Sequence, residues 1–75
     1  MTVNYNLSKI VYFHRKKAGL SRVELAQLAG VGKTVIYDIE KGKRSVRWDT
    51  IQAILQVLNI SIEYKSPLME LYEKS

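Results

Sequence analysis

The residue types and spacing most suited to chemistry lie between positions 32 and 47 of the chain. A short segment with apolar residues at helical spacing presents an outward face of hydrogen-bonding side chains, namely Lys33, Thr34, Tyr37 and Asp38. Cationic side chains follow at once, namely Lys41, Lys43, Arg44 and Arg47. Polar side chains on one helix face can reach base edges in a nucleic-acid groove, and flanking cations can contact phosphates. The pattern therefore predicts a nucleic-acid interface.

Catalytic chemistry finds little support in the same sequence. His14 is the one histidine, it falls on an apolar stripe, and the chain has no cysteine. Nucleophilic catalysis needs a base beside a nucleophile, and a metal site needs several ligands at suitable spacing. The run GVGKT lacks the spacing of a phosphate-binding loop and follows no predicted strand. We expect no enzymatic activity, no catalytic residues, no metal and no cofactor.

The charge of the chain is divided unevenly between its two parts. Residues 1–47 carry ten Lys or Arg and three Asp or Glu, whereas residues 48–75 carry two and four. A basic half on a small domain is typical of a polyanion partner, although it is also compatible with an ordinary solvated surface. The 75 residues suffice for a single domain, which we place over 1–75. No apolar run is long enough for a membrane span and no secretory segment begins the chain, so we expect a soluble cytoplasmic domain with no membrane partner.

Four helices are expected to position these side chains. The first begins near Asn6 or Ser8 and ends at Gly19, the second lies between Ser21 and Gly30, the third runs over 32–41 and the fourth over 48–58. Ser21 followed by Glu24 three residues later predicts a capping box. The apolar stripe of the fourth helix consists of Trp48, Ile51, Ile54, Leu55 and Leu58.

The pattern changes after Asn59. Ile60, Ile62 and Tyr64 alternate with polar residues, which predicts one short strand over 60–64. Because this strand has no partner in its own chain, we expect it to pair with its copy in a dimer. Ser66 and Pro67 then indicate the start of a last helical turn or two. The predicted fold class is an all-α domain of four to five helices with one short C-terminal β-strand.

Two longer runs resemble a known family. LSRVELAQLAGVGKTVIYDIEKGKR is similar to the helix-turn-helix segment of the lambda-repressor-like, Cro/cI or XRE family of DNA-binding domains. SVRWDTIQAILQVLNISIEY is similar to the corresponding part of HipB-type regulators. The resemblance covers about residues 7–64 and implies a helix-turn-helix core over about 7–58.

The resemblance also implies roles for single residues. Gly32, Lys33, Thr34 and Tyr37 occupy positions that reach base edges, and Asp38 shares their face. The residues expected on the DNA backbone are Arg22, Lys41, Lys43, Arg44 and Arg47. Arg22 replaces a frequent glutamine and Gly32 a usual serine, which puts a glutamine–adenine contact and one side-chain cap in doubt. Arg15 and Glu40 are expected to form a structural salt bridge.

Two functions follow from these expectations. The first is a transcriptional regulator that represses by occupying a palindromic operator on double-stranded DNA as a homodimer, with recognition helices about 34 Å apart. Ile60, Ile62 and Tyr64 would form the dimer contact. The alternative is an antitoxin that mainly binds a HipA-like toxin kinase and regulates its own gene only secondarily. An RNA-binding role is disfavoured because no sheet with exposed stacking aromatics is expected.

Overall fold

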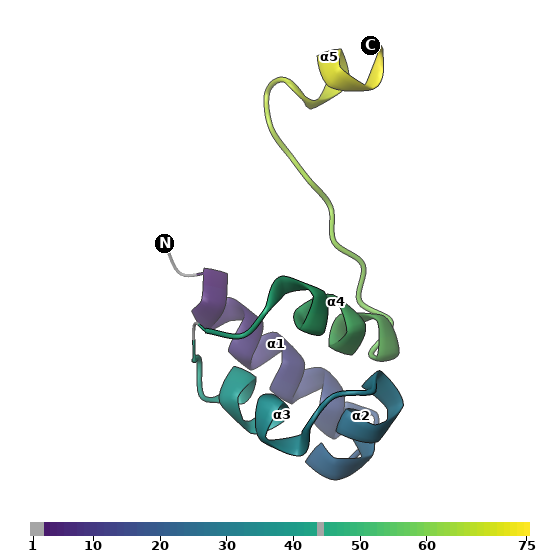
Figure 1. Ribbon diagram of the computed structural model, residues 1–75. Helices are drawn as coiled ribbons and strands as arrows, with labels where there is room; N and C mark the ends of the chain where they lie inside the picture. The colour runs from purple at the N-terminus through teal and green to yellow at the C-terminus, as the bar shows by residue number, and fades with distance from the viewer. Residues whose placement is uncertain (1–2, 44) are drawn as a thin grey trace.

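Five helices make up the regular structure of the chain. The computed structural model describes residues 3–43 and 45–75, with side chains from residue 7 onward. The helices are α1 (Val3–Lys17), α2 (Arg22–Ala29), α3 (Lys33–Glu40), α4 (Trp48–Val57) and α5 (Met69–Glu73). α2 packs against both α3 and α4, and α1 packs against α3, so these four form one body. An extended segment carries α5 away from that body (Figure 1). The all-helical part of the predicted fold class is confirmed.

The ends of α2 follow the residues that the sequence offers there. Ser21 Oγ accepts a hydrogen bond from the Glu24 N–H at 3.0 Å, and Glu24 Oε1 accepts one from the Ser21 N–H at 2.8 Å. This is the predicted capping box. At the other end Gly30 adopts a left-handed conformation with φ 72°, which a residue without Cβ adopts at little cost. The Val31 N–H then donates to Ala26 O at 2.9 Å, which turns the chain sharply toward α3.

The core lies where the four helices meet. Its buried side chains are Val11, Leu25, Ala26, Ile36, Ile39, Ile54 and Leu55. Apolar residues just beyond three helix ends, namely Leu20, Val31 and Ile60, pack against this cluster. Such a contact commonly accompanies a left-handed helix end. The core therefore fixes the angle at which each connection leaves its helix, and with it the placement of α3.

Two expectations about helix ends were wrong. α1 begins at Val3, so Ser8 lies within this helix instead of capping it, and its hydroxyl donates to the backbone carbonyl of Glu40. Trp48 was expected on the buried stripe of α4 but is 52 % exposed. It is the first residue of α4, and helical side chains lean toward the N-terminus of their helix, so its ring extends beyond the body.

The predicted strand over 60–64 is not confirmed. Among the residues that the structure describes there is no β-strand, and this segment is extended and mostly exposed. A strand needs the backbone of a second strand for its hydrogen bonds, and the single chain supplies none. The last helix begins at Met69 instead of Pro67, and the Ser66 hydroxyl accepts a 3.3 Å hydrogen bond from the Leu68 N–H in the turn before it.

No helix within the described residues has the length and apolar character that a membrane span requires.

Candidate nucleic-acid interface

α3 separates apolar from polar side chains around its axis. Ile36 and Ile39 are buried in the core, whereas Lys33, Thr34 and Tyr37 are exposed and Asp38 is half-buried. Gly32 is the N-cap of α3 and provides no side-chain hydrogen bond there. The structure thus places the five residues predicted to reach base edges on or beside one exposed helix face. That face ends at Lys41, which is the C-cap of α3.

A buried carboxylate lies at the C-terminal end of α3. Glu40 Oε2 accepts a hydrogen bond from Arg15 Nε at 2.6 Å, and Glu40 Oε1 accepts one from Arg15 Nη2 at 3.2 Å. Their side chains are only 7 % and 4 % exposed, for Arg15 and Glu40 respectively. Arg15 also donates through Nη1 to Leu20 O at 2.8 Å. The structure therefore brings the predicted pair into contact, and this pair joins α1, α3 and the turn before α2.

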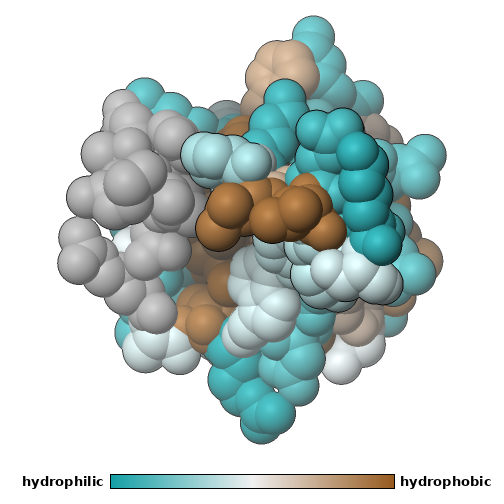
Figure 2. All heavy atoms as spheres, turned by 90° about the horizontal axis from the view of Figure 1, so that it is seen from above, coloured by the Kyte–Doolittle hydropathy of each residue, from teal (hydrophilic) through white to brown (hydrophobic). Residues whose placement is uncertain are grey.

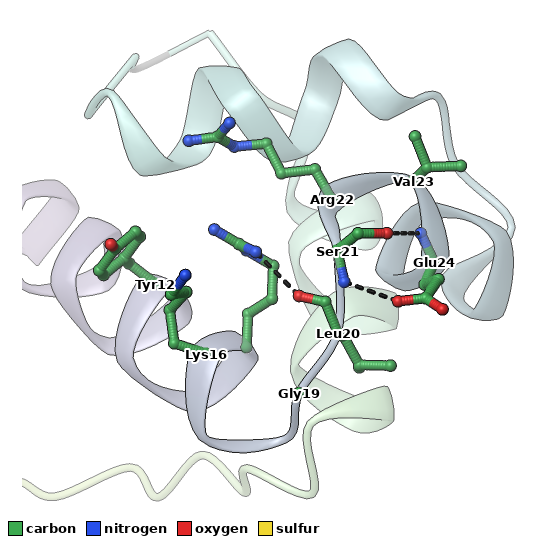
Figure 3. Close-up of a pocket in the computed structure, with 9 residues that line it drawn as sticks. Tyr12, Lys16, Gly19, Leu20, Ser21, Arg22, Val23 and Glu24 are labelled. Carbon is green, nitrogen blue, oxygen red and sulfur yellow. Dashed lines mark hydrogen bonds between the residues drawn. The ribbon is translucent and has the colours of Figure 1, made fainter.

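Arg22 reaches the same carboxylate from the start of α2. Its Nε donates to Glu40 Oε1 at 3.0 Å, and its guanidinium lies over the Tyr37 ring with Cζ 5.4 Å from the ring centroid. Lys41 Nζ lies 5.4 Å from the same centroid. Figure 3 shows Arg22 beside a surface hollow that Tyr12 and Lys16 line from α1. Arg22, Tyr37 and Lys41 therefore form one connected group on the exposed side of the body.

The other predicted backbone cations also have partners in the chain. Lys43 Nζ lies 3.6 Å from Asp38 Oδ2, and Arg47 Nη2 lies 3.0 Å from Asp49 Oδ2. Arg44 lies outside the described residues. Lys43 follows α3 and its backbone N–H donates to Asp38 O at 2.9 Å, so the basic loop stays close to the helix that precedes it.

The residues predicted to form the dimer contact lie outside this face, in the segment that follows α4. Ile60 packs against the core, whereas Ile62 is 40 % and Tyr64 is 69 % exposed. With Gln52, Leu55 and Gln56 of α4, these three residues line a shallow groove where the chain leaves the body. Figure 2 views the molecule from the side of the C-terminal segment and shows apolar atoms exposed there among hydrophilic ones. The body thus partly buries Ile60, whereas Ile62 and Tyr64 stay more exposed along this groove.

Sequence reasoning missed the contacts that Arg22 makes. The spacing of Tyr37 and Lys41, four residues apart on one helix, indicates that these two side chains are neighbours. The contact between Arg22 and Glu40 joins residues 18 positions apart on different helices. No local pattern indicates it, because it depends on the angle between α2 and α3.

Metal chemistry has no visible basis in this site. Within the ranges 3–43 and 45–75, no three His, Cys, Asp or Glu residues are grouped so that they could hold a metal ion. The polar groups of this face are instead hydrogen-bond donors and cations, with Asp38 as its acceptor. Such a face is suited to an anionic partner.

Comparison with known proteins agrees with this geometry. The helix-turn-helix family model matches residues 13–65, which include all of α2, α3 and α4. The chain is also 36 % identical over 62 residues to a Sinorhizobium fredii (strain NBRC 101917 / NGR234) protein named as the uncharacterized HTH-type transcriptional regulator y4mF. That alignment covers 83 % of this chain and 82 % of the relative. Neither match bears on the resemblance to HipB-type regulators.

Proposed function

The chain belongs to the helix-turn-helix family, and on this premise we propose that it is a DNA-binding transcription regulator. One observation carries the proposal. An exposed polar helix face and the cations that contact it lie next to one another. We call this set the α3 surface: Arg22, Lys33, Thr34, Tyr37, Asp38, Lys41 and Lys43. A helix with such a surface fits the major groove, where polar side chains reach base edges and cations contact phosphates.

The two kinds of contact have different tasks in this proposal. Lys33, Thr34, Tyr37 and Asp38 face the bases, together with the backbone at Gly32, whose neighbouring N–H groups at the start of α3 can also bind a phosphate. The cations fix the position of α3 along the duplex: Arg22, Lys41, Lys43, Arg44 and Arg47. Repression then follows from occupancy, because a protein bound across a promoter excludes other proteins from it.

We further propose that the regulator acts as a homodimer on a palindromic site. The exposed segment with Ile62 and Tyr64 supports this, because pairing with its copy would satisfy its backbone and cover both side chains. Ile60 would continue the pairing at the edge of the body. Two-fold pairing would also place two α3 helices on successive turns of one DNA face.

Selection of duplexes from a random library by the purified protein tests the proposal. We expect the selected duplex to bind about 10³-fold or more tightly than a scrambled duplex of the same composition. The logarithm of the binding constant should fall with the logarithm of salt concentration, with a slope of about −0.9 for each phosphate contacted. Equal affinity for the two duplexes, or failure to enrich any sequence, contradicts the proposal.

A second candidate function rests on the C-terminal segment. Leu68, Leu71 and Tyr72 are each more than two-thirds exposed, and α5 contains no buried residue. Exposed apolar side chains on and beside a short helix suit a protein partner, as expected for an antitoxin that binds a HipA-like toxin kinase. Co-purification with the product of the adjacent gene tests this. A stable complex that dissociates on Leu71→Asp supports the antitoxin role, and purification of this chain without that product contradicts it.

A further inference from the structure

Glu40 carries a buried negative charge next to a surface that is otherwise basic. Its carboxylate is 4 % exposed and accepts hydrogen bonds from two arginines on two other helices. Arg15 is as buried as its partner, whereas Arg22 is 45 % exposed. The buried arginine alone would neutralise the carboxylate, so the contact with Arg22 calls for a separate explanation.

Two contacts restrict the guanidinium of Arg22. The 3.0 Å hydrogen bond from its Nε to Glu40 fixes one edge of the planar group, and the Tyr37 ring at 5.4 Å lies beside it. An arginine side chain on a protein surface otherwise samples many rotamers, and ordering it on binding costs free energy. Of the Arg22 nitrogens, Glu40 accepts a hydrogen bond from Nε alone. The two η nitrogens at the outer end of this half-exposed side chain therefore remain as a pair of donors.

We propose that Glu40 is a positioning residue for DNA binding, which holds Arg22 so that its η nitrogens form a bidentate contact with one phosphate. The inference rests on the proposed function, since it assigns a task within the α3 surface. Arginine binds phosphate oxygens through two parallel hydrogen bonds, and lysine cannot reproduce this geometry. A phosphate contact carries no sequence information itself, but a bidentate one fixes the register and orientation of α3. Its loss should therefore weaken binding mainly at the selected site, where the side chains of α3 contact the bases.

Positioning by Glu40 and net charge alone predict opposite effects of Glu40→Gln on affinity for the selected duplex. Glu40→Gln removes one negative charge, which should strengthen binding to any duplex if net charge decides affinity. If Glu40 positions Arg22, the same variant should bind the selected duplex about tenfold more weakly or worse, while the scrambled duplex binds as before or more tightly. Glu40→Gln also deprives Arg15 of its ionised partner, so a variant that leaves this buried pair intact must accompany it.

Arg22→Lys is that variant, because it keeps the charge at position 22 and the contact between Arg15 and Glu40. We expect its thermal unfolding midpoint and its salt slope to match those of the original protein. The ratio of affinities for selected and scrambled duplexes should fall about tenfold or more. Lys16→Arg is the matched control, since Lys16 lines the same hollow and the exchange also conserves charge. Its affinity ratio should be unchanged.

Methylphosphonate substitution identifies the contacted group. Neutralising the phosphates of the selected duplex one at a time should reveal a position that weakens binding of the original protein but has no further effect on Arg22→Lys. The inference is overturned if Arg22→Lys keeps the original affinity ratio, or if every phosphate has the same effect on both proteins. A protein that selects no sequence at all contradicts the proposed function instead, so the two failures are distinguishable.

Discussion

At the scale of single residues, the described cations predicted to contact the DNA backbone each have a partner in their own chain. Arg22 contacts Glu40, Lys43 lies near Asp38 and Arg47 near Asp49, while Lys41 lies over Tyr37. Exposed ion pairs stabilise a fold by only about 0–1 kcal/mol, so exchanging such a partner for a phosphate costs little. The exposed pairs therefore leave Lys43 and Arg47 available to phosphates, whereas the buried carboxylate of Glu40 holds Arg22 more firmly.

Tyr37→Ala and Lys43→Ala should affect DNA binding differently. Tyr37→Ala should weaken binding to the selected duplex by about 1–3 kcal/mol and change binding to a scrambled duplex much less, because the ring is proposed to face the bases and two cations lie over it. Lys43→Ala should weaken both duplexes similarly and reduce the salt slope by about one. Titrations at several salt concentrations measure both effects. Lys65→Ala removes the same charge outside the α3 surface and serves as the control for Lys43→Ala. Equal losses of affinity for both duplexes in Tyr37→Ala would show that α3 presents a different face to the DNA.

Arg15 and Glu40 should be strongly coupled in stability. Removing either side chain leaves a buried charge unpaired, so Arg15→Ala and Glu40→Ala should each lower the free energy of unfolding by about 3 kcal/mol. The double variant should recover part of the loss, with a coupling energy of about 1–3 kcal/mol from urea denaturation at one protein concentration. Lys17→Ala, an exposed cation on the same helix, should change stability by less than about 0.5 kcal/mol. Additive losses would refute the coupling.

At the scale of helices, local sequence predicts where most elements end. Ser21 with Glu24 and the glycine at position 30 determine both ends of α2, because capping depends on residues within four positions of each other. Trp48 and the segment over 60–64 were not predicted correctly, since exposure and strand pairing depend on what lies across from them in space. In the site, the face of α3 follows from helical spacing, whereas the contact of Arg22 with Glu40 follows from the packing of α2 on α3.

The turn between α2 and α3 allows a matched test of this local control. Gly30 has φ 72° and Gly32 has φ −73° on either side of Val31. Gly30→Ala should lower the free energy of unfolding by about 1–2 kcal/mol, because an L side chain is strained in the left-handed region. Gly32→Ser should leave the free energy of unfolding unchanged or raise it by roughly a few tenths of a kcal/mol, since serine can cap α3. Thermal denaturation measures both; equal losses at the two positions would exclude this explanation.

At the scale of the whole molecule, the chain consists of a packed body and a C-terminal segment that contributes little to it. The body contains every buried residue of the described chain, and Ile60 is the last of the partly buried apolar residues that pack against the core. Stability and assembly should therefore be separable. Substitutions beyond Ile60 are expected to change association between copies while the body stays folded.

Ile62→Pro should separate the two properties. Proline removes a backbone donor and an apolar side chain from the proposed pairing segment, so sedimentation should shift from dimer to monomer and affinity for the selected duplex should fall. The helical circular dichroism should persist, because Ile62 is 40 % exposed and outside the core. Ser66→Pro, beyond the proposed pairing, should remain dimeric. An original protein that sediments as a monomer at tens of micromolar would refute strand-mediated association.

The extended connection to α5 also determines where a protease can cut. Lys65 lies in this exposed segment, whereas before α4 the Lys43 backbone N–H donates to Asp38 O and Val46 packs against the core. Cleavage needs a stretch of chain that can enter a protease active site, so trypsin should cut first after Lys65 and release residues 66–75. If copies pair through 60–64, this cut should become slower as the protein concentration rises. Limited digestion thus provides a measure of assembly that requires neither a substitution nor a DNA sequence.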